Sequence, residues 1–135
     1  MKIRLYKGKR IAYIANCEFQ TTQLFRAFAT DKAIYFLDCN GNVFKADSKT
    51  KAMTKLKESS TDNRRKRPYI RVAVKTGLKK RIYVEELVAK VMFSQITRRP
   101  RAERIGHFDG NVANNKIDNI YYDLTPREVN EFVGR

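Results

Sequence analysis

The chain has 135 residues, enough for one domain or two very small ones, and 42% of them are hydrophobic, which allows a modest core. Lys and Arg outnumber Asp and Glu by 29 to 14, and the resulting net charge of +15 favours a polyanionic partner over solubility alone. Because no apolar run approaches the ~18 residues of a membrane span and the N-terminus lacks the apolar block of a signal peptide, we expect a cytoplasmic protein with no membrane partner.

The N-terminal part of the chain is predicted to form a hairpin and a helix. Residues 1–18 alternate apolar with basic or small side chains around a turn at Lys7–Lys9, which is typical of paired strands. A helix is expected next, capped by Thr21 or Thr22. Its apolar stripe would consist of Leu24, Phe25 and Phe28. These elements define an N-terminal unit, residues 1–30.

Residues 31–97 are predicted to form a basic α+β module. An apolar run at residues 33–37, the turn signal Asn40–Asn42 and the extended pattern from Val43 onward indicate a hairpin. The highly charged residues 46–67 have few apolar anchors and are expected to form a loop or an arm.

Two more strands and a helix complete this module. Tyr69–Val74 alternates as a strand does, and Arg81–Val84 returns as its partner after a turn at Thr76–Leu78. Glu85–Phe93 carries apolar residues at helical spacing, which predicts a core helix. The basic cluster Arg98–Arg101 contains a proline and ends that helix.

The most informative segment runs from His107 to Ile120. Its motif elements are His107, Asp109-Gly110-Asn111, Asn114-Asn115 and Asn119-Ile120. With this spacing the segment resembles the HNH family of nucleases, in the form common among phage and intron homing endonucleases. The resemblance implies a C-terminal HNH-like ββα finger over residues 98–135 and a role in cleaving DNA.

Three shorter pieces upstream resemble the small DNA-binding module that often precedes such fingers. They are Gly41-Asn42-Val43, Tyr69-Ile70-Arg71-Val72 and Leu87-Val88-Ala89. The two resemblances together imply an α+β fold, with small antiparallel hairpins and a core helix followed by the finger. They also imply double-stranded DNA as the partner, and the cytoplasm of a bacterial host cell as the location of a phage-encoded protein.

His107 is the only histidine in the chain and therefore the natural candidate for a general base, because imidazole takes up a proton near neutral pH. Hydrolysis of a phosphodiester needs such a base, and a divalent cation to hold the charge that develops on the phosphate. The resemblance implies that Asn119 orients the His107 ring. It also implies that an active enzyme would use Mg²⁺ or another divalent metal.

The sequence departs from the family at the metal ligands. The family has Asp, Asn or His directly before the base, whereas this chain has Gly106, which offers no side chain. A second ligand is expected from the helix that Thr125 caps and Pro126 begins. The candidate ligands, all oxygen donors of the kind that hard cations accept, are Glu128, Asn130 and Asp109. Plain helix surface is the alternative for the first two.

Two functions compete on this sequence. The first is a DNA-binding protein derived from an HNH homing endonuclease, with catalysis weakened or lost because of Gly106. The alternative is an active metal-dependent DNA nicking endonuclease with His107 as base, and RNA is a third candidate ligand. A small basic accessory protein of this kind can also have a protein partner.

The residues expected to contact nucleic acid come from the basic clusters and the paired strands, with an ordinary solvated surface as the alternative. Those expected at phosphates are Arg64, Arg65, Lys66, Arg67, Arg98, Arg99 and Arg101. Those expected at base edges are Arg71 and Arg81.

Overall fold

The computed structural model describes residues 1–15, 19–20, 22–57, 67–75 and 78–133. These residues form antiparallel β-strands, two α-helices and two single-turn 3-10 helices, Ala102–Arg104 and Ile117–Asn119. The expectation of a mixed α and β fold with antiparallel hairpins is therefore confirmed. None of the described helices is long and apolar enough to cross a membrane.

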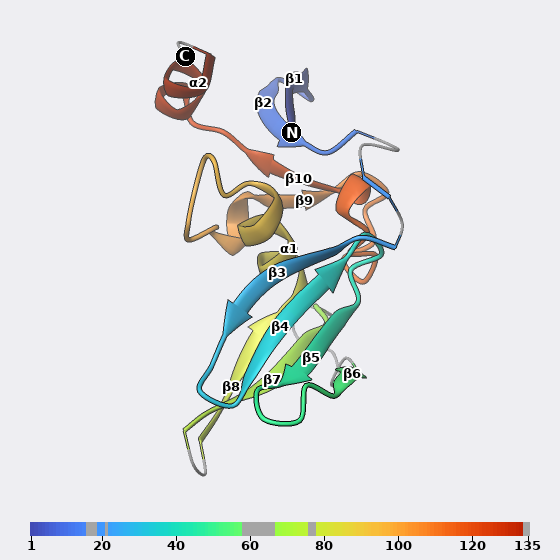
Figure 1. Ribbon diagram of the computed structural model, residues 1–135. Helices are drawn as coiled ribbons and strands as arrows, with labels where there is room; N and C mark the ends of the chain where they lie inside the picture. The colour runs from blue at the N-terminus through green and yellow to red at the C-terminus, as the bar shows by residue number, and fades with distance from the viewer. Residues whose placement is uncertain (16–18, 21, 58–66, 76–77, 134–135) are drawn as a thin grey trace.

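A four-stranded sheet joins the two ends of the chain (Figure 1). Its strands, in spatial order, are β1 (Lys2–Tyr6), β2 (Lys9–Tyr13), β10 (Ile120–Asp123) and β9 (Ile105–His107). Lys7 and Gly8, with φ of 49° and 79°, form the predicted turn between β1 and β2. The N-terminal hairpin thus shares a sheet with the region predicted to be the finger, through the pairing of β2 with β10.

A second four-stranded sheet has the order β3-β4-β5-β6. Its strands are β3 (Leu24–Ala29), β4 (Ala33–Asp38), β5 (Val43–Asp47) and β6 (Met53–Lys55). The predicted helix through Leu24, Phe25 and Phe28 was wrong, because these residues lie in β3 and pair with β4. An irregularity in the register between Arg26 and Phe28 breaks the strict alternation, so both phenylalanines pack against the core.

The predicted pair of strands after the charged segment is confirmed as a two-stranded ribbon. It consists of β7 (Tyr69–Lys75) and β8 (Leu78–Tyr83). Thr76 and Gly77 of the expected turn lie outside the described residues. Of the segment expected to be a loop or arm, residues 53–55 form β6 and residues 58–66 lie outside the described part.

The other two predicted helices, the core helix and the helix that Thr125 caps, are present. The core helix α1 (Val84–Met92) carries Glu85 and Glu86 in its first turn, where carboxylates favour the helix dipole. At the start of α2 (Pro126–Val133), the Thr125 hydroxyl accepts the Glu128 N–H at 3.2 Å, and the Glu128 carboxylate accepts the Thr125 N–H at 2.9 Å. This reciprocal pair is a capping box, so Thr125 caps the helix as predicted.

One hydrophobic core unites α1, both sheets and the ribbon. Residues that are 0% or 1% exposed reach it from each of these elements, including Leu37, Ile70, Val88 and Tyr122. Phe93, directly after α1, stacks on Tyr122 with ring centroids 6.1 Å apart. Each fully buried side chain of this size contributes about 1.5–3 kcal/mol, so this shared core holds the sheets and the ribbon together.

The turn between β4 and β5 docks against the loop between β9 and β10. Gly41 has φ of +81°, and a Cβ at this position would lie 2.4 Å from the backbone oxygen of Asn115. Nearby, the Ile117 N–H donates to the Cys39 carbonyl at 3.1 Å. The Asp38 carboxylate braces the turn by accepting hydrogen bonds from the amides of residues 40 and 42. Only glycine therefore fits at position 41.

We predict that Gly41→Ala destabilises the fold more than Gly8→Ala. Gly8 has nearly the same φ, +79°, but a Cβ there would meet nothing within 4 Å. Gly8→Ala should cost only the left-handed backbone penalty of about 1–2 kcal/mol, whereas Gly41→Ala adds about 1–3 kcal/mol of overpacking. Urea unfolding measures both free energies. Equal losses would contradict the docking of this turn on Asn115.

Candidate functional site

His107 ends β9 and is held by a carboxamide. Its Nε2 lies 3.0 Å from Oδ1 of Asn115, and its backbone pairs with Ile120 at the start of β10. The contact engages Nε2 and leaves Nδ1 as the ring nitrogen that this carboxamide does not contact.

The loop after His107 is organised by the Asp109 carboxylate. Its Oδ2 accepts the Asn114 amide at 2.8 Å, and its Oδ1 accepts the Asn111 N–H at 2.8 Å and the Asn119 amide at 2.9 Å. These donors, the Asn114 side chain foremost, lower the pKa of Asp109 from 3.8 to about 2. Both carboxylate oxygens therefore serve the loop, so Asp109 is not placed as the free metal ligand that was expected.

The Asn119 side chain, which the resemblance implied would orient His107, bonds to the loop after that histidine and not to its ring. Its amide group donates to Asp109 and to the Asn114 carbonyl, and its side-chain oxygen accepts the Asp109 N–H at 3.2 Å. The ring of His107 is held by Asn115 instead. The sequence contains this residue in the Asn-Asn pair, but nothing in the pair indicates which amide faces the histidine.

Asn115 is 3% exposed, and its side-chain nitrogen has no hydrogen-bond partner in the described structure. The Gly41 turn covers its backbone, as described above. The Asn115 amide is thus fixed by packing on one side and by His107 on the other. A carboxamide held in this way fixes the ring orientation of its neighbour.

The position before the histidine is closed by an aromatic ring. Gly106 pairs with Tyr121 across β9 and β10, and a Cβ on Gly106 would lie 2.1 Å from the Tyr121 ring. No residue with a side chain fits there unless the ring moves. The space in which the family carries its first metal ligand is therefore filled by Tyr121.

The expected ligands from α2 are directed elsewhere. Glu128 forms the capping box with Thr125 and an ion pair with Arg104, and these contacts lower its pKa against the opposing effect of burial. Asn130 is exposed and lines a hollow with the β1–β2 turn. Figure 1 shows α2 beyond the end of β10, whereas His107 pairs with the first residue of that strand, about 10 Å away along a four-residue strand.

The residues around His107 therefore do not fit a Mg²⁺ site of the expected composition. In the described ranges, no group of three or more His, Cys, Asp or Glu side chains is arranged to hold a metal ion. Gly106 offers no side-chain oxygen, Asp109 is engaged in its loop, and Glu128 is engaged with Arg104. What the site retains is a histidine held by a carboxamide and a loop organised by the Asp109 carboxylate.

The expected phosphate-contacting residues differ in their placement. Arg98, Arg99 and Arg101 follow α1 and are exposed, as a phosphate contact requires. Arg67 is not: it is 6% exposed, forms an ion pair with Glu85, and lies with its guanidinium carbon 3.9 Å from the Tyr83 ring centroid. The expectation that Arg67 contacts phosphate is therefore wrong. Its positive charge is needed inside the protein, where it pairs with the buried Glu85 carboxylate. Residues 64–66, which are Arg64, Arg65 and Lys66, lie outside the described residues.

Arg71 and Arg81 stand directly opposite one another on the β7–β8 ribbon, and both are exposed. Lys79, opposite Ala73, lies on the same face. The Tyr69 ring lies 4.7 Å from the Arg81 guanidinium carbon and 6.0 Å from that of Arg71, within the range of cation–π attraction. The tyrosine thus holds two positive charges side by side.

This arrangement is unfavourable for the isolated protein. Like charges directly opposite on neighbouring strands repel and destabilise the pair. Within the described part of the chain, no carboxylate forms an ion pair with either Arg71 or Arg81. An external anion would relieve the repulsion.

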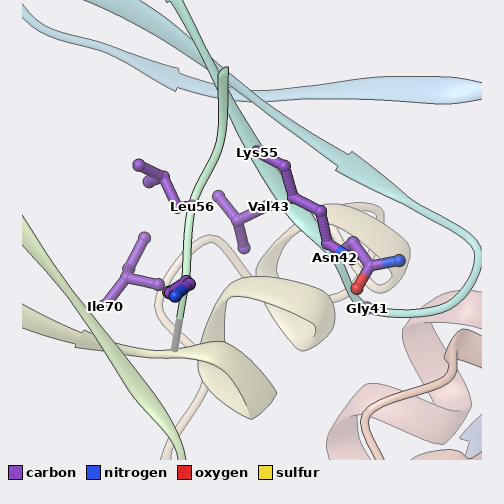
Figure 2. A pocket seen from close by; sticks show the side chains of 7 residues that line it. Gly41, Asn42, Val43, Lys55, Leu56 and Ile70 are labelled. Carbon is purple, nitrogen blue, oxygen red and sulfur yellow. The ribbon is translucent and has the colours of Figure 1, made fainter. Parts of the chain in front are cut away.

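A hollow of about 560 Å³ lies between the β4–β5 turn, the segment after β6, and β7. Figure 2 shows Ile70 on one side of it and Asn42 and Lys55 on the other. His107 is not among the residues that line it. The hollow and the histidine are therefore separate features of the molecule.

Comparisons with known proteins add no assignment to this geometry. The chain matches no protein-family model, and searches of curated proteins and of solved structures found no match.

We predict that Asp109 stabilises the fold in a pH-dependent manner. Its folded-state pKa of about 2 lies below the ordinary value of 3.8, so its contribution is fully present above about pH 5 and is lost as the pH falls toward 2. The difference in urea midpoint between the wild type and Asp109→Asn should shrink over this interval. Asp31→Asn, on an exposed residue outside the loop, is the control. A difference that stays constant down to about pH 2 would contradict the loop geometry.

Proposed function

We propose that this protein binds double-stranded DNA and derives from an HNH homing endonuclease whose catalysis is weakened or lost. The observation that carries the proposal is the exposed, directly opposed pair Arg71 and Arg81. Their repulsion destabilises the ribbon unless a polyanion neutralises it, and the net charge of +15 attracts such a partner from a distance.

The ribbon has the dimensions of a DNA-reading element. Two paired strands lie about 4.8 Å apart, and the major groove, about 12 Å wide, admits a two-stranded β-ribbon. One face of this ribbon buries Ile70 and Val72 in the core, so the opposite face with both arginines is directed outward. Arginine pairs in bidentate fashion with guanine, which makes these two residues the candidates for reading base edges.

Descent from an HNH finger is supported by the order of the secondary-structure elements and by the sequence motif from His107 to Ile120. β9, the Asp109 loop, β10 and α2 follow one another in the ββα order of that family. The loss of catalysis is supported by the Tyr121 ring, which occupies the space beside Gly106. The basic cluster at Arg98–Arg101 would supply sequence-independent phosphate contacts.

An active nicking endonuclease is the second candidate, favoured by one observation. Asn115 holds one ring nitrogen of His107, Nε2, so that the other, Nδ1, is the candidate to take up a proton as a general base does. A divalent metal would then supply charge neutralisation at the phosphate. Its ligands would have to come from residues other than those engaged around Asp109 and Glu128.

We predict that Arg71→Ala and Arg81→Ala each weaken binding to duplex DNA by about 5- to 100-fold, the range expected for loss of one arginine–base contact. Arg127→Ala is the matched control, because Arg127 is 88% exposed in its side chain and the same charge is removed. Fluorescence anisotropy with a labelled duplex at fixed salt measures the three affinities. Losses no larger than that of the control would remove the ribbon from the interface.

Cleavage is tested separately with supercoiled plasmid in the presence of Mg²⁺ or Mn²⁺. The proposal predicts that the plasmid is nicked no faster with the protein than without it, while duplex binding persists. Metal-dependent nicking that disappears in His107→Ala would establish the second candidate instead. His107→Ala that still binds the duplex serves as the folding control.

A further inference from the structure

Four aromatic rings gather on the outer face of the β1-β2-β10-β9 sheet, from Tyr6, Tyr13, Phe108 and Tyr121. In β2, Tyr13 lies between Ala12 and Ile14, which are 0% and 3% exposed in the core. Tyr121 lies in the same way between two core residues of β10. Because side chains alternate along a strand, both tyrosines are directed away from the core, and they stand opposite one another in the register.

The rings form one cluster with a cation on it. Tyr6 lies 5.3 Å from Tyr121 and 5.2 Å from Phe108, and Phe108 lies 4.8 Å from Tyr121, between ring centroids. The exposed Arg4 has its guanidinium carbon 4.7 Å from the Tyr13 ring and 5.2 Å from Phe108. All four rings remain half-buried rather than sealed. A planar cation therefore lies over aromatic surface at the border with solvent.

Gly106 leaves room for one ring of the cluster. The Tyr121 ring occupies the space of a side chain at that position, 2.1 Å from where a Cβ would lie. The same glycine is the departure from the nuclease pattern at the first metal ligand.

Basic side chains surround the cluster. Exposed Lys2 stands opposite Tyr13 in the register, and the Lys7 ammonium lies 5.3 Å from the Tyr6 ring centroid. The carboxylate of Asp123, on the same face, pairs with Lys9 at 3.5 Å. Among the described residues, no carboxylate forms an ion pair with Lys2, Arg4 or Lys7. Aromatic rings bordered by cations are the combination with which proteins bind single-stranded nucleic acid, through stacked bases and neutralised phosphates.

We propose that this face binds unpaired nucleotides, with bases stacking on the Tyr6, Tyr13, Phe108 and Tyr121 cluster or on the Arg4 plane, and with Arg4, Lys2 and Lys7 at the phosphates. Duplex DNA offers no such base faces, because its bases are stacked within the helix. The site is therefore distinct from the β7–β8 ribbon and does not depend on duplex binding. Single-stranded DNA and RNA share the required chemistry, and the test separates them.

The test uses fluorescence anisotropy with three labelled strands of about 12 nucleotides, a length that spans one binding site of this kind. They are oligo(dT), oligo(rU) and an abasic deoxyribose strand with the same number of phosphates. Oligo(dT) or oligo(rU) should bind at least about tenfold tighter than the abasic strand, and the tighter of the two identifies the source. Equal binding of all three would overturn the proposal, because phosphates alone would then account for it.

Substitutions in the aromatic cluster test whether it is the binding site. Tyr6→Leu and Tyr13→Leu keep apolar bulk and remove the π face, so each should weaken oligo(dT) binding by about 5- to 100-fold while the abasic strand is unaffected. Phe36→Leu, on a half-buried ring of β4 in the other sheet, is the control. A base preference that survives in the Tyr6→Leu, Tyr13→Leu double variant, or that is lost equally in Phe36→Leu, would overturn the placement.

Tyrosine fluorescence gives a readout that needs no variant. The chain has 7 Tyr and no Trp, so its emission reports on tyrosine alone. Oligo(dT) should quench it at saturation, and the abasic strand should not. Duplex binding that persists when this quenching is absent would leave the β7–β8 proposal standing and would remove this one.

Discussion

The close contact between Gly106 and the Tyr121 ring constrains much of what this protein can do. β9 and β10 pair in a register that places these two residues opposite one another, and the ring then fills the space of any side chain at position 106. Tyr121 lies on one of the two central strands of the first sheet, since β10 pairs with both β2 and β9. The residue at position 106 therefore affects both which side chain can stand before His107 and how the Tyr121 ring packs on the outer face.

The two faces of this sheet carry different features. The inner face contributes Ile120 and Tyr122 to the shared core, and His107 at its edge is held by Asn115 under the β4–β5 turn. The outer face carries the aromatic cluster. His107 at the end of β9, the basic ribbon and the aromatic face are thus three separate features, and the proposals above assign nucleic-acid binding to the last two.

Local patterns predicted local structure well. Alternation identified the β1–β2 and β7–β8 hairpins, and the turn signal at Asn40–Asn42 identified the β4–β5 hairpin. Helical spacing identified α1, and Thr125 before Pro126 marked the start of α2. The helix expected through Leu24, Phe25 and Phe28 was wrong because the register irregularity between Arg26 and Phe28 lets both phenylalanines reach the core from a strand, at a spacing that also fits a helix. A short segment cannot distinguish these two patterns.

Long-range contacts could not be predicted in this way. The pairing of β2 with β10 and the docking of Gly41 on Asn115 join distant segments, and no local pattern records them. They nevertheless shape the site, because Gly41 packs against Asn115, and Asn115 rather than Asn119 contacts the His107 ring. Likewise, the burial of Arg67 follows from Glu85 in α1, which a run of basic residues does not reveal.

The central claim is that the outward face of the β7–β8 ribbon receives DNA. The most direct measurement follows the arginine Nε–H resonances by NMR while the labelled protein is titrated with a duplex. The account predicts that the signals of Arg71 and Arg81 shift, whereas that of Arg67, enclosed by Glu85 and Tyr83, stays in place. Shifts confined to other arginines, with Arg71 and Arg81 unchanged at saturation, would contradict it.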